Sequence, residues 1–118
     1  MTTTTDPRFA ACQTASWLAG WLAIDPMMIE AMRRDGELIA VREPGTTTWL
    51  YPGWQFDGRV PLSSIPRITR AARETGIDET RLFTILAAPR GLANGSGYVY
   101  ELLHEGRADD VVQLVRAG

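Results

Sequence analysis

The chain has 118 residues, and its 12 basic against 14 acidic residues give a formal net charge of −2. This length favours one domain that buries a core without disulfides or structural metals. The charge balance excludes a chain-wide basic footprint for nucleic acid, and the lone Cys12 and lone His104 exclude an internal disulfide and a multi-histidine metal site. We therefore expect no metal and no cofactor.

The beginning of the sequence shows no targeting or membrane signal. The apolar run from Phe9 to Ile24 is interrupted by Gln13, Thr14 and Ser16 and is too short to span a bilayer. The leading "MTTTTDPR" lacks the basic region of a signal peptide. We expect a soluble cytoplasmic protein that makes no membrane contact, with residues 1–13 forming a flexible N-terminus.

Two short helices are predicted next. Apolar residues at helical spacing indicate a first helix from about Thr14 to Ala23. In the second helix, Asp25 is the predicted N-cap, Pro26 suits the first helical position and Gly36 marks the end. The short connection between them is typical of a helix-turn-helix. The apolar residues that define the two helices are Trp17, Leu18, Trp21 and Leu22, followed by Met28, Ile29 and Met32.

A β-hairpin follows the second helix. The runs "ELIAVRE" and "TTTWLY" are rich in strand-forming residues and are separated by "PGT", which is a turn signal. They predict a hairpin from about Leu38 to Tyr51. Helix, helix and hairpin in this order predict a winged helix-turn-helix over residues 14–56.

The second half of the chain is predicted to be helical. "WQFDGRVPLSS" is a predicted connector, and Ser64 is the predicted cap of a helix that starts near Pro66 and stops at Gly76. Asp78 is the predicted cap of the next helix, "APRGLANGSG" is a predicted loop, and "YVYELLHEG" and "ADDVVQLVRAG" predict two more helices. The predicted fold class is therefore mainly α with one β-hairpin: a winged helix-turn-helix followed by a small C-terminal helical bundle, residues 57–118, packed on it.

The stretch "WLYPGWQFDG" concentrates aromatic residues at the end of the hairpin. A stacking platform for nucleic acid usually places basic residues beside its rings, and this stretch contains no Arg. We expect Trp49, Tyr51, Trp54 and Phe56 instead to pin the hairpin onto the helical half, with Pro52 and Gly53 turning the chain between them.

Two parts of the sequence resemble known families. "LAGWLAIDPMMIEAMRRDGELIAVRE" with its hairpin resembles the winged helix-turn-helix modules of excisionase and MerR-like proteins, and "YPGWQFDG" with "LLHEGRADDVVQLV" is similar to the toxin-binding domain of Xre/MbcA/ParS-type antitoxins. Some actinobacterial winged-helix proteins share this helical tail. The resemblance spans about Thr14 to Ala117. Related DNA readers carry Ser, Arg, Lys or Gln on the second helix, where this chain has Pro26, Met27, Met28, Glu30 and Ala31.

The first functional hypothesis is a DNA-binding transcriptional regulator that binds double-stranded DNA. The resemblance implies that the second helix, Pro26 to Asp35, enters the major groove while arginines hold phosphates and the hairpin tip contacts the backbone. The threonines of the tip have a second interpretation, because Thr is also a good strand residue. The candidate DNA-binding residues are Met27, Met28, Glu30, Arg33, Arg34, Arg42, Thr46, Thr47 and Thr48.

A secondary basic ridge is predicted in the C-terminal half. Arg67, Arg70 and Arg73 follow at three-residue steps on one predicted helix. Residues 57–90 hold six Arg against four acidic residues, whereas residues 14–56 hold three Arg against five. The ridge is either a solvated helix face or a contact for the DNA backbone or an acidic partner.

The second functional hypothesis is an antitoxin-like or adaptor module that binds protein and has reduced or no DNA binding. The acidic balance of residues 14–56 favours it, and its toxin-like partner would dock on the C-terminal helices or on the helix that carries the methionines. A homodimer is compatible with both hypotheses. The sequence contains no HExxH, Walker or GxGxxG motif, and "GLANGSG" does not follow a strand of a βαβ unit, so we expect no enzyme activity.

Overall fold

The computed structural model describes residues 12–89 and 97–118. The predicted frayed start "MTTTTDPR" and the "GLANGSG" part of the predicted loop therefore lie outside the described residues or at their edge. The described chain is mainly α-helical with small antiparallel sheets, which confirms this part of the predicted fold class. In chain order the elements are β1 (Cys12–Thr14), α1 (Ala15–Leu22), α2 (Pro26–Arg34), β2 (Val41–Arg42), β3 (Trp49–Pro52), the 3-10 turn η2 (Gly53–Gln55), β4 (Phe56–Asp57), β5 (Val60–Pro61), α3 (Ile65–Thr75), α4 (Glu79–Leu86), α5 (Glu101–His104) and α6 (Ala108–Ala117).

Helix α2 begins after its predicted cap Asp25, and α1 begins after a cap at Thr14 that was not predicted. The Thr14 hydroxyl accepts a hydrogen bond from the Trp17 amide at 3.2 Å, and the Asp25 carboxylate accepts one from the Met27 amide at 2.8 Å. Each cap satisfies an amide that the first helical turn leaves without a partner. Pro26 occupies the first turn of α2, as predicted.

The first sheet has β3 in its centre, with β1 and β2 paired antiparallel on either side. Strand β1 corrects the expectation that Cys12 and Gln13 belong to a flexible N-terminus. Cys12 lies opposite Pro52, and burial raises the pKa of its thiol to about 11. Three residues are too short a run to show the alternation that identifies a strand, so this pairing becomes visible only beside its partner β3.

The predicted hairpin is present, but its paired region is shorter than Leu38 to Tyr51. Its tip is a type II turn in which the Thr46 amide bonds the Glu43 carbonyl and Gly45 adopts φ +79°, a conformation that Gly adopts without strain. Strand β2 pairs with β3 only at Val41 and Arg42. The reason is that the backbone groups of Ile39 have another partner.

That partner is the side chain of Gln55, which is fully buried. Its Oε1 accepts a hydrogen bond from the Ile39 amide at 2.6 Å, and its Nε2 donates to the Ile39 carbonyl at 2.8 Å and to the Pro52 carbonyl at 3.0 Å. The amide side chain therefore occupies the place of a neighbouring strand. Buried backbone groups require such partners, and here one side chain satisfies both groups of Ile39.

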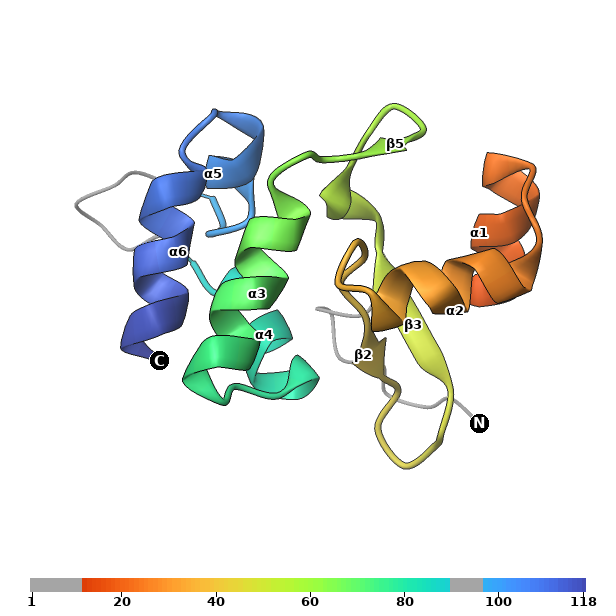
Figure 1. Cartoon of the computed structure of the whole chain (residues 1–118), viewed down its shortest axis with the longest axis horizontal. Helices are drawn as coiled ribbons and strands as arrows, with labels where there is room; N and C mark the ends of the chain where they lie inside the picture. Colours follow the sequence, from red (N-terminus) through yellow and green to blue (C-terminus); the bar gives the residue numbers. More distant parts are fainter. Residues whose placement is uncertain (1–11, 90–96) are drawn as a thin grey trace.

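The segment 38–40 separates two hydrophobic cores. Leu38 and Ala40 face the first core, and Ile39 faces the second, as expected for extended backbone whose side chains alternate. Figure 1 shows α1 and α2 on one side of the strands and α3 to α6 on the other. The first core consists of Leu18, Ala19, Ile29, Leu38, Ala40, Tyr51 and Phe56. The second contains Ile39 with buried residues of the C-terminal helices, among them Ile65, Ile68, Leu86, Val111 and Val115.

The aromatic residues of the connecting stretch divide between these cores. Trp54 packs against the second core and stacks on Tyr100, with ring centroids 4.9 Å apart. Trp49, Tyr51 and Phe56 belong to the first core. Of the four residues expected to pin the hairpin onto the helical half, Trp54 is the one that reaches it. The predicted connector also contains β4 and β5, which form a small hairpin of their own.

The C-terminal helices end and begin near their predicted signals. Asp78 caps α4 by accepting a hydrogen bond from the Arg81 amide at 2.8 Å. Helix α3 begins at Ile65, and the Ser64 side chain makes no capping hydrogen bond to a described residue, contrary to the expectation for Ser64. Ion pairs join α3 to α6, one of them between Glu74 and Arg116 at 3.2 Å. No helix in the described part of the chain is long and apolar enough to cross a membrane.

We predict that Gln55→Leu lowers the free energy of unfolding by about 2–4 kcal/mol, because the buried amide and carbonyl of Ile39 lose their partner. Urea denaturation measures this loss. The matched control Gln113→Leu, at an exposed position of α6, should change stability by less than about 0.5 kcal/mol. Equal stabilities of the two variants would contradict the role of Gln55.

Candidate nucleic-acid interface

Helix α2 exposes most of its candidate DNA-binding residues. Ile29 is fully buried in the first core, whereas Met27 is 77% and Met28 53% exposed. Glu30 and Arg34 are also exposed, and Glu30 Oε1 lies 3.9 Å from Arg34 Nη1. An exposed ion pair at this distance contributes little free energy. Both side chains therefore remain available to a ligand.

Arg33 and Arg42 converge on the Trp49 ring, and we call these three residues the Trp49 cluster. The guanidinium carbon lies 4.3 Å from the ring centroid for Arg33 and 4.9 Å for Arg42. Arg42 lies directly opposite Trp49 in the β2–β3 pair, and Arg33 approaches from the last turn of α2. The ring face attracts each cation. Among the described residues, no carboxylate forms an ion pair with either arginine.

The buried Tyr51 lies next to Arg33 of the Trp49 cluster. The Tyr51 hydroxyl and Arg33 Nε are both buried, and neither has a hydrogen-bond partner among the described residues. Burial raises the pKa of Tyr51, and the nearby Arg33 opposes this shift. Arg33 is thereby held between the indole ring of Trp49 and the phenol of Tyr51, and its guanidinium has less freedom than that of the exposed Arg34.

The three threonines of the hairpin tip differ in what their side chains do. The Thr46 hydroxyl donates to the Glu43 carbonyl at 3.0 Å and accepts from the Thr48 amide at 3.1 Å. It therefore orders the turn. Thr47 and Thr48 are exposed at the tip, which projects away from the C-terminal helices (Figure 1).

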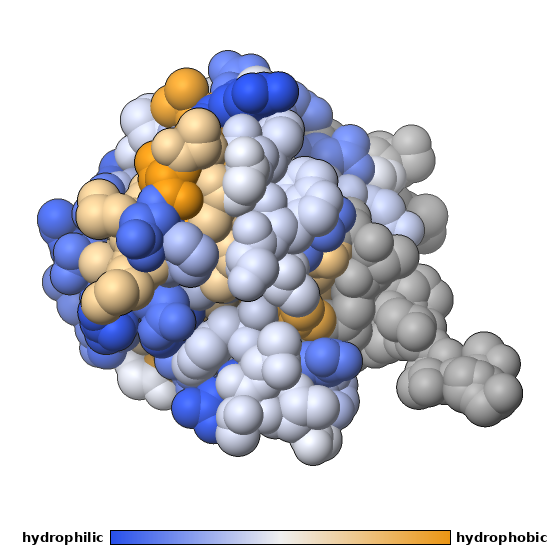
Figure 2. Space-filling view, turned by 90° about the vertical axis from the view of Figure 1, so that its right-hand side faces the viewer, coloured by the Kyte–Doolittle hydropathy of each residue, from blue (hydrophilic) through white to orange (hydrophobic). Residues whose placement is uncertain are grey.

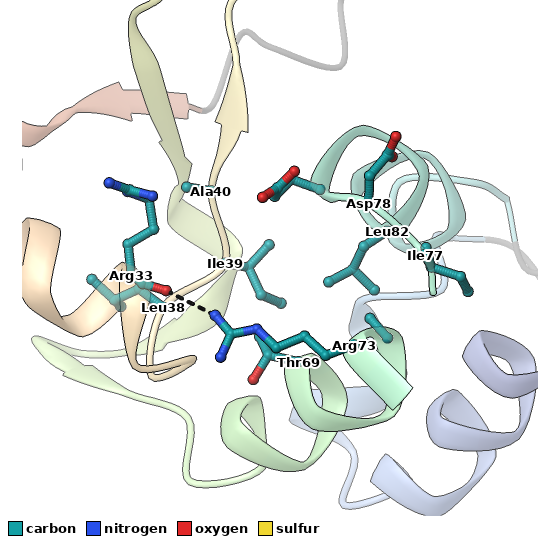
Figure 3. A pocket seen from close by; sticks show the side chains of 11 residues that line it. Arg33, Leu38, Ile39, Ala40, Thr69, Arg73, Ile77, Asp78 and Leu82 are labelled. Carbon is teal, nitrogen blue, oxygen red and sulfur yellow. Dashed lines mark hydrogen bonds between the residues drawn. The ribbon is translucent and has the colours of Figure 1, made fainter. Parts of the chain in front are cut away.

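The end of α2 is held from α3. Arg73 Nη2 donates to the Arg34 carbonyl at 2.9 Å and to the Arg33 carbonyl at 3.3 Å, and Figure 3 shows the Arg33 side chain leading away from this contact. A cation suits the negative end of a helix. The Thr69 hydroxyl donates to the Gly36 carbonyl at 2.6 Å. Gly36 has φ +80°, and a Cβ there would lie 2.8 Å from Thr69 Oγ1, so no larger residue fits.

The three arginines of the predicted basic ridge are therefore in different situations. Arg67 forms an ion pair with Asp109 of α6, and Arg73 caps α2. Arg70 is exposed and forms no hydrogen bond or ion pair with a described residue. The structure does not bring the three together as free cations. The predicted spacing is correct, but these long-range partners have no signal in the local sequence.

A small cavity lies where the two cores meet (Figure 3). Its volume is about 80 Å³, and Arg33, Ile39, Arg73, Glu79 and Leu82 are among its lining residues. Ligand pockets are typically several hundred Å³. This cavity is therefore too small for an organic cofactor. A larger and more open hollow of about 410 Å³ lies beside α4 and α6, where Ile85 and Leu114 are among its lining residues.

Comparison with known proteins shows the fold. The sequence matches no protein-family profile and no curated protein. Among solved structures, the NMR structure of Rv2175c is similar with a TM-score of 0.79 and 20% sequence identity, over 98% of this chain and 85% of that chain. The shared fold thus includes both the α1–β3 part and the C-terminal helices.

We predict that Tyr51→Phe changes the free energy of unfolding at neutral pH by less than about 1 kcal/mol, because the hydroxyl that it removes has no partner. At alkaline pH the two proteins should differ. The raised pKa of Tyr51 means that its stabilising contribution is complete below the unfolded value of about 10 and is lost as pH rises through the folded value.

Urea denaturation across this alkaline range tests the prediction. The wild type should lose stability with a steeper pH dependence than Tyr51→Phe. Identical pH dependence of the two proteins would show that the Tyr51 phenol is not held in a desolvated site.

Proposed function

We propose that this protein is a DNA-binding transcriptional regulator of the winged helix-turn-helix type. The observation that carries the proposal is the Trp49 cluster. It concentrates two positive charges where the end of α2 meets the β2–β3 hairpin, in a chain whose net charge is negative. Under this proposal α2 is the reading helix and the β2–β3 hairpin is the wing.

The arrangement gives each group a separate role. Helix α2 enters the major groove with its exposed residues toward the base edges. Arg42 and Arg34 hold phosphates, and Arg33 supports Arg42 by sharing the Trp49 ring. Thr47 and Thr48 approach the backbone at the wing tip, where hydroxyls bond phosphate oxygens.

The acidic residues around α2 limit the strength of this binding. Residues 14–56 contain three arginines against the five acidic residues Asp25, Glu30, Asp35, Glu37 and Glu43. Phosphate neutralisation supplies most sequence-independent affinity. We therefore expect weak binding to random duplex, with a small number of phosphate contacts per protomer.

We predict that binding to a random duplex weakens as salt rises, with a slope of log affinity against log salt of about −2 for one protomer and about −4 for a dimer, since Arg34 and Arg42 each neutralise one phosphate. Fluorescence anisotropy of labelled duplex measures this slope. Arg34→Ala and Arg42→Ala should each reduce its magnitude by about 1, because each removes one phosphate contact.

Arg70→Ala is the matched control, since Arg70 is an exposed arginine of α3. Its slope should equal that of the wild type. Loss of binding in Arg70→Ala with normal binding in the other two variants would place DNA on α3 instead. Absence of duplex binding at low salt would refute the proposed function.

A second candidate function rests on the exposed apolar residues. Trp17 is about half exposed on α1, close in sequence to the exposed methionines of α2, and Leu114 is exposed on α6. Exposed methionine suits an adaptable protein surface. Under this alternative the protein is an antitoxin-like or adaptor module, with a toxin-like partner on α2 or on the C-terminal helices.

For this alternative we predict that the tagged full chain recovers one stoichiometric protein partner from its native host, and that Leu114→Glu or Met27→Glu weakens the recovery. Either charge would be buried at the interface without a partner, at a cost of several kcal/mol. Recovery of no stable partner would count against the alternative, as would an undiminished complex in both variants.

A further inference from the structure

The first turn of α2 presents no side chain that reads bases by strong hydrogen bonds. Met27, Glu30 and Arg34 follow one another at helical spacing and are exposed, with Met28 beside them. Glu30 only accepts hydrogen bonds, Arg34 only donates, and a thioether does neither strongly. The described part of this face offers no amide or hydroxyl side chain for bidentate recognition of adenine.

What the face does offer at its start is apolar surface. Met27 and Met28 lie in the first turn of α2, after the Asp25 cap and Pro26. Figure 2 shows the end of the molecule that α1 and α2 form. Apolar side chains gather on one part of this end. In a helix-turn-helix, the N-terminal residues of the reading helix are the ones that contact base edges.

The charges near these methionines are of both signs. The first turn of α2 contains no acidic residue, and the Asp25 carboxylate is already bonded to the Met27 amide. The N-terminus of a helix carries partial positive charge. Further along the same face Arg34 supplies a full positive charge that attracts phosphate, whereas Asp25 and Glu30 keep their negative charges beside the methionines.

The main apolar group in the major groove is the 5-methyl group of thymine. We propose that Met27 and Met28 are specificity-determining residues that contact thymine methyl groups, so that the protein prefers A·T pairs beneath the start of α2. This inference rests on the proposed DNA binding. A methionine side chain that packs on a methyl group removes both from water without requiring a hydrogen bond.

The test compares two short duplexes, one of alternating adenine and thymine and the other of alternating adenine and deoxyuridine. They present the same hydrogen-bonding groups in the major groove and differ only in the methyl group. The wild type should bind the thymine duplex about 4-fold more tightly for one buried methyl group and about 15-fold for two. Anisotropy titration of the full chain at low salt measures both affinities.

Variants assign the preference to its residues. The double variant Met27→Ala, Met28→Ala should bind both duplexes with nearly equal affinity, and its fold should be intact because both side chains are exposed. Leu114→Ala is the matched control: it removes an exposed apolar side chain from α6 and should keep the full preference.

Each other outcome overturns a defined statement. Equal binding of the two duplexes by the wild type would overturn the methyl contact and leave DNA binding intact. A preference that persists in the double variant would show that duplex shape is read elsewhere, which also overturns the role of the methionines. Absence of binding to both duplexes would refute the proposed function together with this inference, and would leave the methionines to a protein partner.

Discussion

The hydrogen bonds between the Gln55 side chain and the backbone of Ile39 are the constraint on which the arrangement of the two cores depends. They end the pairing of β2 before Ile39 and hold segment 38–40 extended without a neighbouring strand. The alternation of the segment then directs Leu38 and Ala40 to one core and Ile39 to the other. A buried amide that is fully satisfied specifies one geometry more strictly than an apolar residue, since any displacement leaves polar groups without partners.

The arginines of this chain have different partners and therefore different roles. In a chain without lysine every cation is a planar fork with several donors, and the structure uses them in unlike ways. Arg73 caps a helix and Arg67 pairs with a carboxylate, so both stabilise contacts within the fold. Arg33 and Arg42 instead share the Trp49 ring, where no described carboxylate pairs with them. The partners of each arginine, and not the number of charges, therefore decide whether it stabilises a contact within the fold.

Much of the local structure was predictable, because its causes are local. The caps Thr14, Asp25 and Asp78, the Pro-Gly turn and the glycine that follows α2 act within a few residues of their own positions. Other features depend on partners that are far away in the sequence. They are the short strand β1, the early end of the β2–β3 pairing, and the different partners of Arg67 and Arg73. Of the candidate interface, the exposure of the α2 residues could be anticipated from helical spacing. The meeting of Arg33 and Arg42 on Trp49 could not, because it requires the packing of α2 against the sheet.

The attachment of α2 to α3 has a consequence for the energetics of binding. Because Arg73 and Thr69 bond the last carbonyls of α2 and its Gly36 exit, α2 cannot change its angle to the C-terminal helices while these bonds remain. These bonds join α2 to the C-terminal helices. A ligand that binds α2 and a ligand that binds α3 to α6 would therefore both act on the contact between α2 and α3. If both ligands bound one position of this joint more tightly than another, thermodynamic linkage would make each change the affinity of the other by the same factor.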